Sequence, residues 1–208
     1  MNEIKYLNDS VDITRKSIIL RSDFNVPIIN KLIQDKTRID ACIPFIKKLL
    51  SRNAKVYLVS HLGRPKNEKD TDLTLKPVFE YLKEKISNKI FFYDEKIDEN
   101  TKQKVSFIKS GELILFENIR FNLGEIKNDD QFSKNLSSFG DIYINDAFSC
   151  SHRKQASIHK ITKYIKHLYA GPLFMKELNA INLLLNTKKK PVTCIIGGSK
   201  ISTKLGVI

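Results

Sequence analysis

The chain has 208 residues, a length that fits one full domain and a small additional piece. Its composition, 41% hydrophobic and 28% charged, is that of a soluble globular protein with a sizeable core. No apolar run approaches the roughly 18 residues of a membrane span, and the first residues lack the apolar region of a signal peptide. A membrane or exported protein is therefore not expected. The formal net charge of +13 leaves nucleic acids, anionic membranes and anionic metabolites open as partners.

The cysteine pattern indicates a reducing compartment. Cys42, Cys150 and Cys194 are far apart in the chain, and none belongs to a C-x-x-C motif. An odd number of cysteines without metal-ligand spacing argues against a disulfide framework and against a structural metal site. We therefore expect a cytoplasmic protein without a metal site in this part of the chain.

Apolar runs alternate with helical periods along the chain. The pattern predicts strands over residues 17–24, 54–60, 112–118 and 141–148, and a further apolar run, "KIFFY", lies at 89–93. It predicts helices after a cap at Asp35, over 73–86, in a polar stretch up to 109, and over 129–139. Strands separated by helices of this length imply right-handed βαβ units. The predicted fold class is α/β, with a doubly wound, Rossmann-like parallel sheet.

The pattern changes near Gly171 and Pro172. Residues 173–187 form a strongly amphipathic segment, which predicts a long helix. The sequence from 191 to 208 then predicts a strand, a Gly-rich turn and the start of a helix. We therefore predict a first domain over 1–170, an interdomain helix and hinge over 171–190, and the truncated first βα unit of a second α/β domain over 191–208.

Each predicted strand ends in polar residues of similar kinds. They are Asp23 and Asn25, then His61 and Arg64, then Glu117, Asn118 and Arg120, and last Asn145, Asp146, His152 and Arg153, with Arg38 at the start of the helix after the first strand. In a parallel sheet these ends face one way, so the side chains can converge on one cleft. Four arginines with a nearby histidine are donors suited to a phosphate and a carboxylate together.

Each of these residues also has an ordinary interpretation. A single arginine after a strand is usually solvated, and His61 could be a packed core residue. We expect Asp146 to cap the turn after its strand, Glu117 to pair with a neighbouring arginine, and Gly63 to shape a turn. Repetition at four equivalent strand ends favours the functional interpretation.

The segment "IIGGSK", from Ile195 to Lys200, has the form of a strand, paired glycines and a helix start. Such a turn can present backbone N–H groups to phosphate oxygens. Lys200 and Lys204 would lie on one face of the helix that follows. The segment lacks the Walker A and G-x-G-x-x-G patterns, so alone it is equally compatible with an ordinary turn.

With these residues in place, the chain resembles the N-terminal half of a phosphoglycerate kinase. The matching segments are "RSDFNVPI", "DKTRIDACIPFI", "VSHLGRPK", "LFENIRFNLGEIKND", "YINDAFSCSHRKQAS", "AGPLFMKEL" and "GGSKISTKLGVI". The resemblance implies phosphoryl transfer between 1,3-bisphosphoglycerate and ADP, which gives 3-phosphoglycerate and ATP with Mg²⁺. It also implies that the first domain holds the phosphoglycerate and the second the nucleotide, and that the two close about a hinge.

The resemblance also implies a role for each matching residue. It implies that the phosphoglycerate contacts are Asp23, Asn25, Arg38, His61, Leu62, Gly63, Arg64, Arg120 and Arg153. Arg38 and Lys200 would act on the transferred phosphoryl group, and Lys204 would contact the nucleotide. Ser22 and Gln155 depart from the common residues of the family, and the acidic Mg²⁺ ligand lies beyond this chain.

Three alternatives stay open at this point. A nucleic-acid-binding module would need a basic stripe interleaved with aromatic residues, whereas the lysines here are dispersed. A sugar-phosphate isomerase would need a general base, for which only His61 or His152 could serve. The chain could also be a fragment that binds 3-phosphoglycerate without turnover. We expect small-molecule substrates, no nucleic-acid or membrane partner, and a monomer.

Overall fold

The computed structural model describes residues 4–66, 70–187, 190–193 and 195. The chain divides into two compact units, residues 1–177 and 178–208. In the described part of the chain, no helix has the length and apolar character needed to cross a lipid bilayer. The sheet and the candidate site both belong to the first unit.

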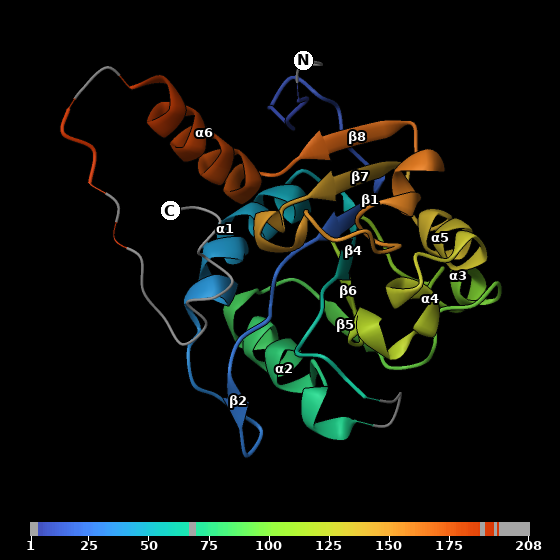
Figure 1. Ribbon diagram of the computed structural model, residues 1–208. Coiled ribbons are helices and arrows are strands. Elements are labelled where there is room, and N and C mark those ends of the chain that lie inside the picture. The colour runs from blue at the N-terminus through green and yellow to red at the C-terminus, as the bar shows by residue number, and fades with distance from the viewer. Residues whose placement is uncertain (1–3, 67–69, 188–189, 194, 196–208) are drawn as a thin grey trace. The chain divides into compact units, whose positions relative to one another are not determined.

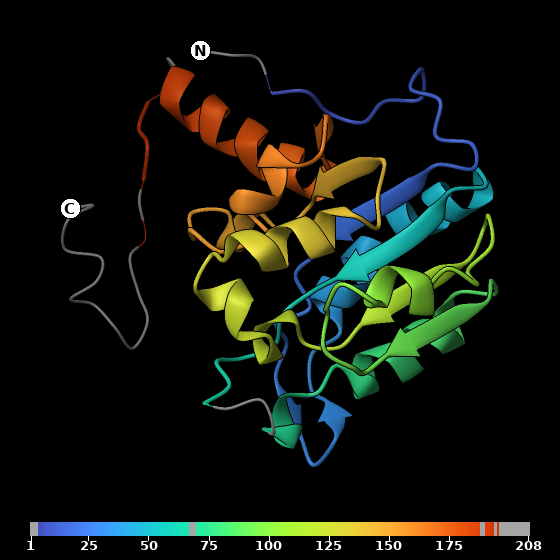
Figure 2. The ribbon, with the colours of Figure 1, turned by 90° about the vertical axis from the view of Figure 1, so that its right-hand side faces the viewer.

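The described residues of the first unit form a six-stranded sheet in which every pairing is parallel. In spatial order its strands are β5 (Ile90–Tyr93), β6 (Leu113–Phe116), β4 (Lys55–Val59), β1 (Ser17–Arg21), β7 (Ile142–Asn145) and β8 (His167–Ala170). Figure 2 shows the strand arrows of this sheet pointing the same way. The predicted α/β class with a parallel sheet is confirmed.

Helices cover both faces of the sheet. The covering helices are α1 (Thr37–Ser51), α2 (Lys76–Lys85), α3 (Thr101–Lys104), α4 (Leu123–Ile126) and α5 (Asp130–Ser137), and a further helix, α6 (Pro172–Asn186), follows β8 in the chain. Helices α1 and α2 lie on one face, and α3, α4 and α5 lie on the other (Figure 1). This arrangement is the doubly wound one.

The sequence of β1 shows how both faces are buried. Ile18 and Leu20 pack into a core with Ile46 of α1, whereas Ile19 packs into a second core with Leu136 of α5. Because successive side chains of a strand point to opposite faces, a continuous apolar run gives a strand that is covered on both sides.

The short elements depart most from the sequence prediction. The polar stretch before 109 forms only the four-residue helix α3, and the helix predicted over 129–139 is limited to α5, with α4 just before it. Strand β8 and the hairpin of β2 (Ile28–Ile29) and β3 (Leu32–Ile33) were not predicted from the sequence. Short 3-10 turns also occur, at Thr71–Leu73 (η1), Ile119–Phe121 (η2), Phe148–Cys150 (η3) and Lys160–Lys163 (η4).

Two expectations concern the second part of the chain. The predicted helix over 173–187 is present as α6. Residues 191–193 and 195 have no regular secondary structure. The rest of the predicted βα unit, with Lys200 and Lys204, lies outside the described residues.

Candidate functional site

The position of β1 in the sheet indicates where a ligand site is expected. From β1 the chain continues to β4 on one side, and it later returns to β7 on the other side. Ligands of open α/β sheets bind at such a switch point, beyond the carboxyl ends of the strands. The loops that leave β1, β4, β6 and β7 carry the residues that the sequence singled out.

His61, directly after β4, is the centre of a group of positive charges. Its ring is buried, with 3% of its surface exposed. Burial and, in decreasing order of effect, the nearby charges of Arg21, Arg120, Arg153 and Arg38 together lower the pKa of His61 to about 2. We call these four residues the arginine cluster. They come from β1, η2, the loop after β7 and α1, so guanidinium groups from four segments meet at one sheet edge.

Arg38 is held by a carboxylate from the loop after β1. Its Nη1 lies 2.8 Å from Oδ2 of Asp23, and it also donates to the carbonyl of Asn25 at 3.4 Å. The hydroxyl of Ser149 donates to the same Asp23 oxygen. About half of the Arg38 side-chain surface is exposed, at 52%. The guanidinium therefore has a fixed partner on one side and solvent on the other.

Gly63 joins two of the predicted contacts. Its N–H donates to Oδ1 of Asn25 at 2.9 Å, and its carbonyl accepts from Nη1 of Arg120 at 2.5 Å. Arg120 is 95% buried and also donates to Gln155 at 3.3 Å. Burial, together with the smaller effects of the Arg153 and Arg21 charges, lowers the pKa of the Arg120 guanidinium to about 10.

Leu62 differs from the other predicted contacts. Its side chain is buried in the core, and both of its backbone polar groups are bound to Asn118. Leu62 therefore shapes the loop, while its neighbours carry the polar groups.

Two of the predicted arginines, Arg153 and Arg64, differ in how their guanidinium groups are placed. The Nε–H of Arg153 is buried and has no hydrogen-bond partner among the described residues. Arg64 is exposed, and in the described part of the chain no hydrogen bond or ion pair joins it to the arginine cluster. Arg153 thus offers a buried donor, and Arg64 an exposed charge on the adjoining loop.

A set of buried partners behind the arginine cluster was not predicted from the sequence. Arg21 is completely buried at the end of β1, where it donates to Ser157 and to the ring of His61. Glu125 of α4 is also completely buried and accepts two hydrogen bonds from Ser157. The signal for Arg21 was present in the sequence, since a charged residue ends the apolar run "SIIL".

Two interpretations of acidic residues need correction. Glu117 does not pair with an arginine. Its carboxylate accepts from the Thr74 hydroxyl at 2.5 Å and from the Leu75 N–H at 2.7 Å, at the start of α2. Arg120 is not available to it, because its guanidinium turns to the neighbouring loops instead.

Asp146 caps a helix rather than the turn after its strand. Its Oδ1 accepts from the N–H groups of Leu173 and Phe174, at 2.7 and 3.0 Å, in the first turn of α6. The turn after β7 is instead closed by Asn145, which accepts from the Ala147 N–H. Asp146 is almost completely buried. Burial raises its pKa to about 6, although the hydrogen bonds from Phe174 and Leu173 act in the opposite direction and lower it.

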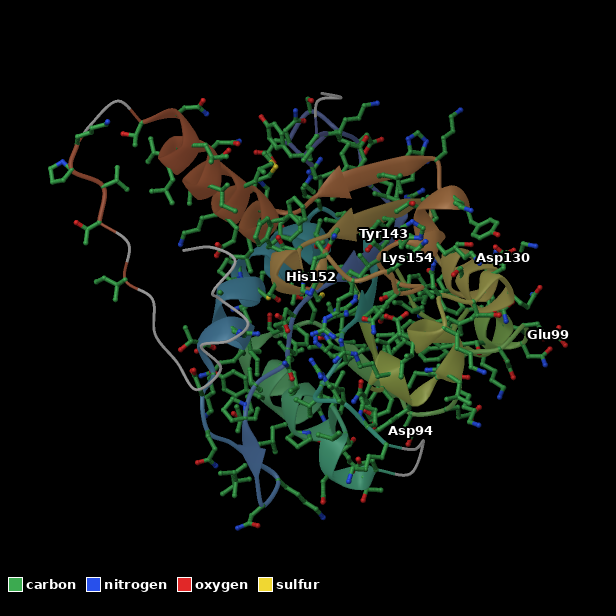
Figure 3. The ribbon with its side chains drawn as sticks, in the orientation of Figure 1. Asp94, Glu99, Asp130, Tyr143, His152 and Lys154 are labelled. Carbon is green, nitrogen blue, oxygen red and sulfur yellow. The ribbon has the colours of Figure 1, made fainter. Side chains whose placement is uncertain are left out.

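Some acidic side chains lie away from the loop after β7. Figure 3 labels His152 on the loop after β7, and in that view Glu99 and Asp130 lie apart from it, on the side of α3 and α5. Among the described residues, no group of three or more His, Cys, Asp or Glu side chains could hold a metal ion. The positive sheet edge therefore suits an anion.

The chain is similar over most of its length to phosphoglycerate kinases. The sequence model of the phosphoglycerate kinase family matches residues 8–208. A phosphoglycerate kinase of Wolbachia sp. subsp. Drosophila simulans (strain wRi) is 44% identical over 200 residues, which are 96% of this chain and 50% of that protein. One of Buchnera aphidicola subsp. Schizaphis graminum (strain Sg) is 44% identical over 95% of this chain and 50% of its own.

Solved structures agree with the sequence matches. The structure of phosphoglycerate kinase from Coxiella burnetii matches with a TM-score of 0.82 and 35% identity, over 96% of this chain and 50% of that one. The enzyme from Pyrococcus horikoshii OT3 matches with a TM-score of 0.86 and 28% identity, over 97% and 51%. The chain thus spans about half the length of these relatives. On these matches and this fold, the chain belongs to the phosphoglycerate kinase family.

Proposed function

We propose that this chain is the phosphoglycerate-binding half of a phosphoglycerate kinase. The complete enzyme transfers a phosphoryl group between 1,3-bisphosphoglycerate and ADP, which gives 3-phosphoglycerate and ATP. In this proposal residues 1–170 bind the three-carbon acid, 171–190 form the interdomain helix and hinge, and 191–208 begin the nucleotide-binding domain. We further propose a monomeric cytoplasmic enzyme without nucleic-acid or membrane partners.

One observation carries the proposal: guanidinium groups from distant parts of the chain surround His61 at one sheet edge. Positive charges in a buried position are costly unless an anion compensates for them. Arg153 keeps a buried donor without a protein partner, and Arg38 is half exposed. A small acid with one phosphate and one carboxylate can accept several such forked donors at once.

The chemistry of this reaction agrees with the residue types. In the ATP-consuming direction the nucleophile is a carboxylate, which is ionised at neutral pH and needs no general base. His61, with a pKa of about 2, is a poor base at neutral pH, which speaks against the isomerase alternative. The reaction needs alignment and positive charge, and the sheet edge offers both.

We assign Arg38 to the charge of the transferred phosphoryl group from the side of this domain. Asp23 holds that guanidinium in place without covering its exposed side. Lys200 would act from the other side, and Lys204 would contact the nucleotide; both lie outside the described residues. His61, Arg64, Arg120 and Arg153 would hold the phosphate and the carboxylate of the acid, while Asn25 and Gly63 keep the adjoining loops in register.

The proposed cofactor is ATP or ADP with Mg²⁺, which neutralises phosphate charge when bound. No acidic metal site occurs among the described residues, so we assign no metal ligand to them. The two half-sites must meet for transfer, and closure about the 171–190 segment would bring them together and expel water.

The experiment uses two assays on one sample of this chain. Calorimetric titration with 3-phosphoglycerate measures binding, and a coupled assay with 1,3-bisphosphoglycerate and ADP measures ATP formation. Binding with ATP formation supports the kinase in full, and binding without it supports the fragment alternative. Absence of 3-phosphoglycerate binding, together with retention of nucleic acid on a filter at physiological salt, would overturn the proposal.

A further inference from the structure

The hydrogen bond between Arg21 and His61 determines where the imidazole carries its proton. Nη2 of Arg21 lies 3.1 Å from Nδ1 of His61. A guanidinium has only donors, so Nδ1 must accept with a free lone pair. An imidazolium has protons on both nitrogens and could not accept this bond. The geometry therefore requires a neutral ring with its proton on Nε2.

Arg21 itself is fixed by a directed chain of hydrogen bonds. Its Nε donates to Oγ of Ser157 at 3.0 Å, and its Nη1 donates to the carbonyl of Ser22 at 2.5 Å. The Ser157 hydroxyl donates in turn to Oε1 of Glu125 at 2.7 Å, and the Ser157 N–H donates to Oε2 at 2.7 Å. Each donor thus has one acceptor, and the sequence of bonds runs from His61 to a buried carboxylate.

The segment that carries Ser157 is tied to α4 by more than this side chain. The Ala156 N–H donates to the carbonyl of Glu125 at 3.0 Å, and the Tyr143 hydroxyl donates to the carbonyl of Ser157 at 2.6 Å. Since Glu125, Ser157 and Tyr143 are all buried, solvent does not compete for these groups. The Arg21 guanidinium therefore has little freedom to turn away from His61.

The surroundings of His61 act in the same direction. The charged groups that face it are Arg21 of β1, Arg120 of η2, Arg153 of the loop after β7 and Arg38 of α1, and all are positive. A proton on Nδ1 would meet the Arg21 donor and add a fifth positive charge to a buried site. The neutral ring with a proton on Nε2 avoids both costs.

We propose that Arg21, held by Ser157 and Glu125, is a positioning residue that keeps His61 neutral with its proton on Nε2. His61 then serves the site as a hydrogen-bond donor with the same protonation across the whole working pH range. That consequence for the anionic ligand rests on the proposed function, whereas the state of the ring itself does not.

The test is a ¹⁵N nuclear magnetic resonance measurement on the ring nitrogens of this chain without ligand, from pH 5 to 8. The expected result for His61 is an unprotonated Nδ1, a protonated Nε2 and no titration over this range. A coupling between Arg21 Nη2 and His61 Nδ1 across the hydrogen bond is expected too. A protonated Nδ1, or titration of His61 near its ordinary value, would overturn the inference.

A variant tests the part played by Arg21. In Arg21→Met the donor is lost, so both tautomers of His61 should appear and its pKa should rise. Arg15→Met, at an exposed position before β1, should leave the ring unchanged. An unchanged tautomer in folded Arg21→Met would contradict the positioning role, and the wild-type spectra decide the question if that variant does not fold.

Addition of 3-phosphoglycerate separates this inference from the proposed function. If His61 has its proton on Nε2 as predicted but 3-phosphoglycerate does not bind, the result supports the inference about the ring and contradicts the proposed function. Binding to a chain whose His61 titrates normally would support the function and overturn the inference.

Discussion

Asn118 binds both backbone polar groups of Leu62: its Oδ1 accepts from the Leu62 N–H at 3.2 Å, and its Nδ2 donates to the Leu62 carbonyl at 2.7 Å. The same side chain donates to the carbonyl of Leu73 and accepts from the N–H of Arg120. One completely buried amide thus joins the loop after β4 to the loop after β6. These loops carry His61, Gly63 and Arg120, so the Asn118 side chain fixes the position of these three residues relative to one another.

Replacement of Asn118 by alanine should therefore destabilise the chain strongly. It leaves buried backbone groups of Leu62, Leu73 and Arg120 without partners, and each unsatisfied group costs about 1–3 kcal/mol. We expect the free energy of unfolding to fall by about 3 kcal/mol in urea titrations. Asn100→Ala, at an exposed position, is the control and should change it little. A loss of less than about 1 kcal/mol for Asn118→Ala would show that these bonds do not join the loops.

Arg38→Ala should separate turnover from affinity in a complete phosphoglycerate kinase that carries this sequence. The guanidinium is assigned to the charge of the transferred phosphoryl group, which is greatest in the transition state. We expect kcat to fall by roughly 30- to 1000-fold, with a much smaller change in the KM for phosphoglycerate. Steady-state kinetics measure both, with Arg15→Ala as the exposed control. An effect mainly on KM would assign Arg38 to substrate binding instead.

Gly63→Ala should weaken phosphoglycerate binding through the backbone. Gly63 has a φ of +57°, and an added Cβ would lie 2.6 Å from Cδ2 of Leu73. The left-handed conformation alone costs about 1–2 kcal/mol with a side chain. A shift of this residue moves both the Asn25 and the Arg120 contacts. Calorimetry should show at least about tenfold weaker binding of 3-phosphoglycerate, which is about 1.4 kcal/mol.

Gly111 supplies the matched control for Gly63. Its φ is +81°, but an added Cβ would meet nothing closer than the Leu50 carbonyl at 3.6 Å, and it lies before β6, at the opposite end of the strand from Asn118. Gly111→Ala should therefore cost stability without a loss of affinity. Equal losses of affinity in both variants would mean that Gly63 acts only through global stability.

Asp146→Asn should change how stability depends on pH. Burial raises the folded-state pKa of Asp146 to about 6, above its ordinary value near 3.8. Between these values the folded state holds the proton more tightly, so the free energy of unfolding of the wild type falls as pH rises through this window. Two pKa units correspond to about 3 kcal/mol. Asparagine keeps an acceptor for the α6 cap but does not ionise.

The difference in unfolding free energy between Asp146→Asn and the wild type should thus rise by about 3 kcal/mol from pH 4 to pH 7. Urea titrations at several pH values measure it, and Asp141→Asn, at an exposed position, serves as the control. Parallel pH curves for Asp146→Asn and the wild type would show that Asp146 is not held in a raised-pKa environment.

The sequence predicts the strands that contain an unbroken apolar run, because burial on both faces requires apolar side chains on both, as in Ile18–Leu20 of β1 and Val56–Val59 of β4. It did not predict β8, whose residues His167–Ala170 are mixed in polarity. An edge strand is covered less completely, and β8 is defined by its pairing with β7, more than twenty residues earlier in the chain.

The sequence indicated polar residues that follow a strand, such as His61 and Arg120, and the structure places these two side chains near each other. The partners of those residues were not predictable from the sequence. Glu125 and Ser157 are 32 residues apart in the chain, and nothing local in either segment indicates that they meet. Glu117 was assigned to the wrong partner for a similar reason, since its donors belong to the start of α2, about 42 residues earlier.

A map of backbone amide chemical shifts of this chain during titration with 3-phosphoglycerate tests most directly whether the arginine cluster binds the acid. We predict saturable shifts that concentrate on the loops after β1, β4, β6 and β7, with Asn25, Gly63, Arg120 and Arg153 among the most affected amides. Shifts spread over unrelated surfaces, or no saturable shift at these four residues, would contradict the claim that the arginine cluster receives one small acid.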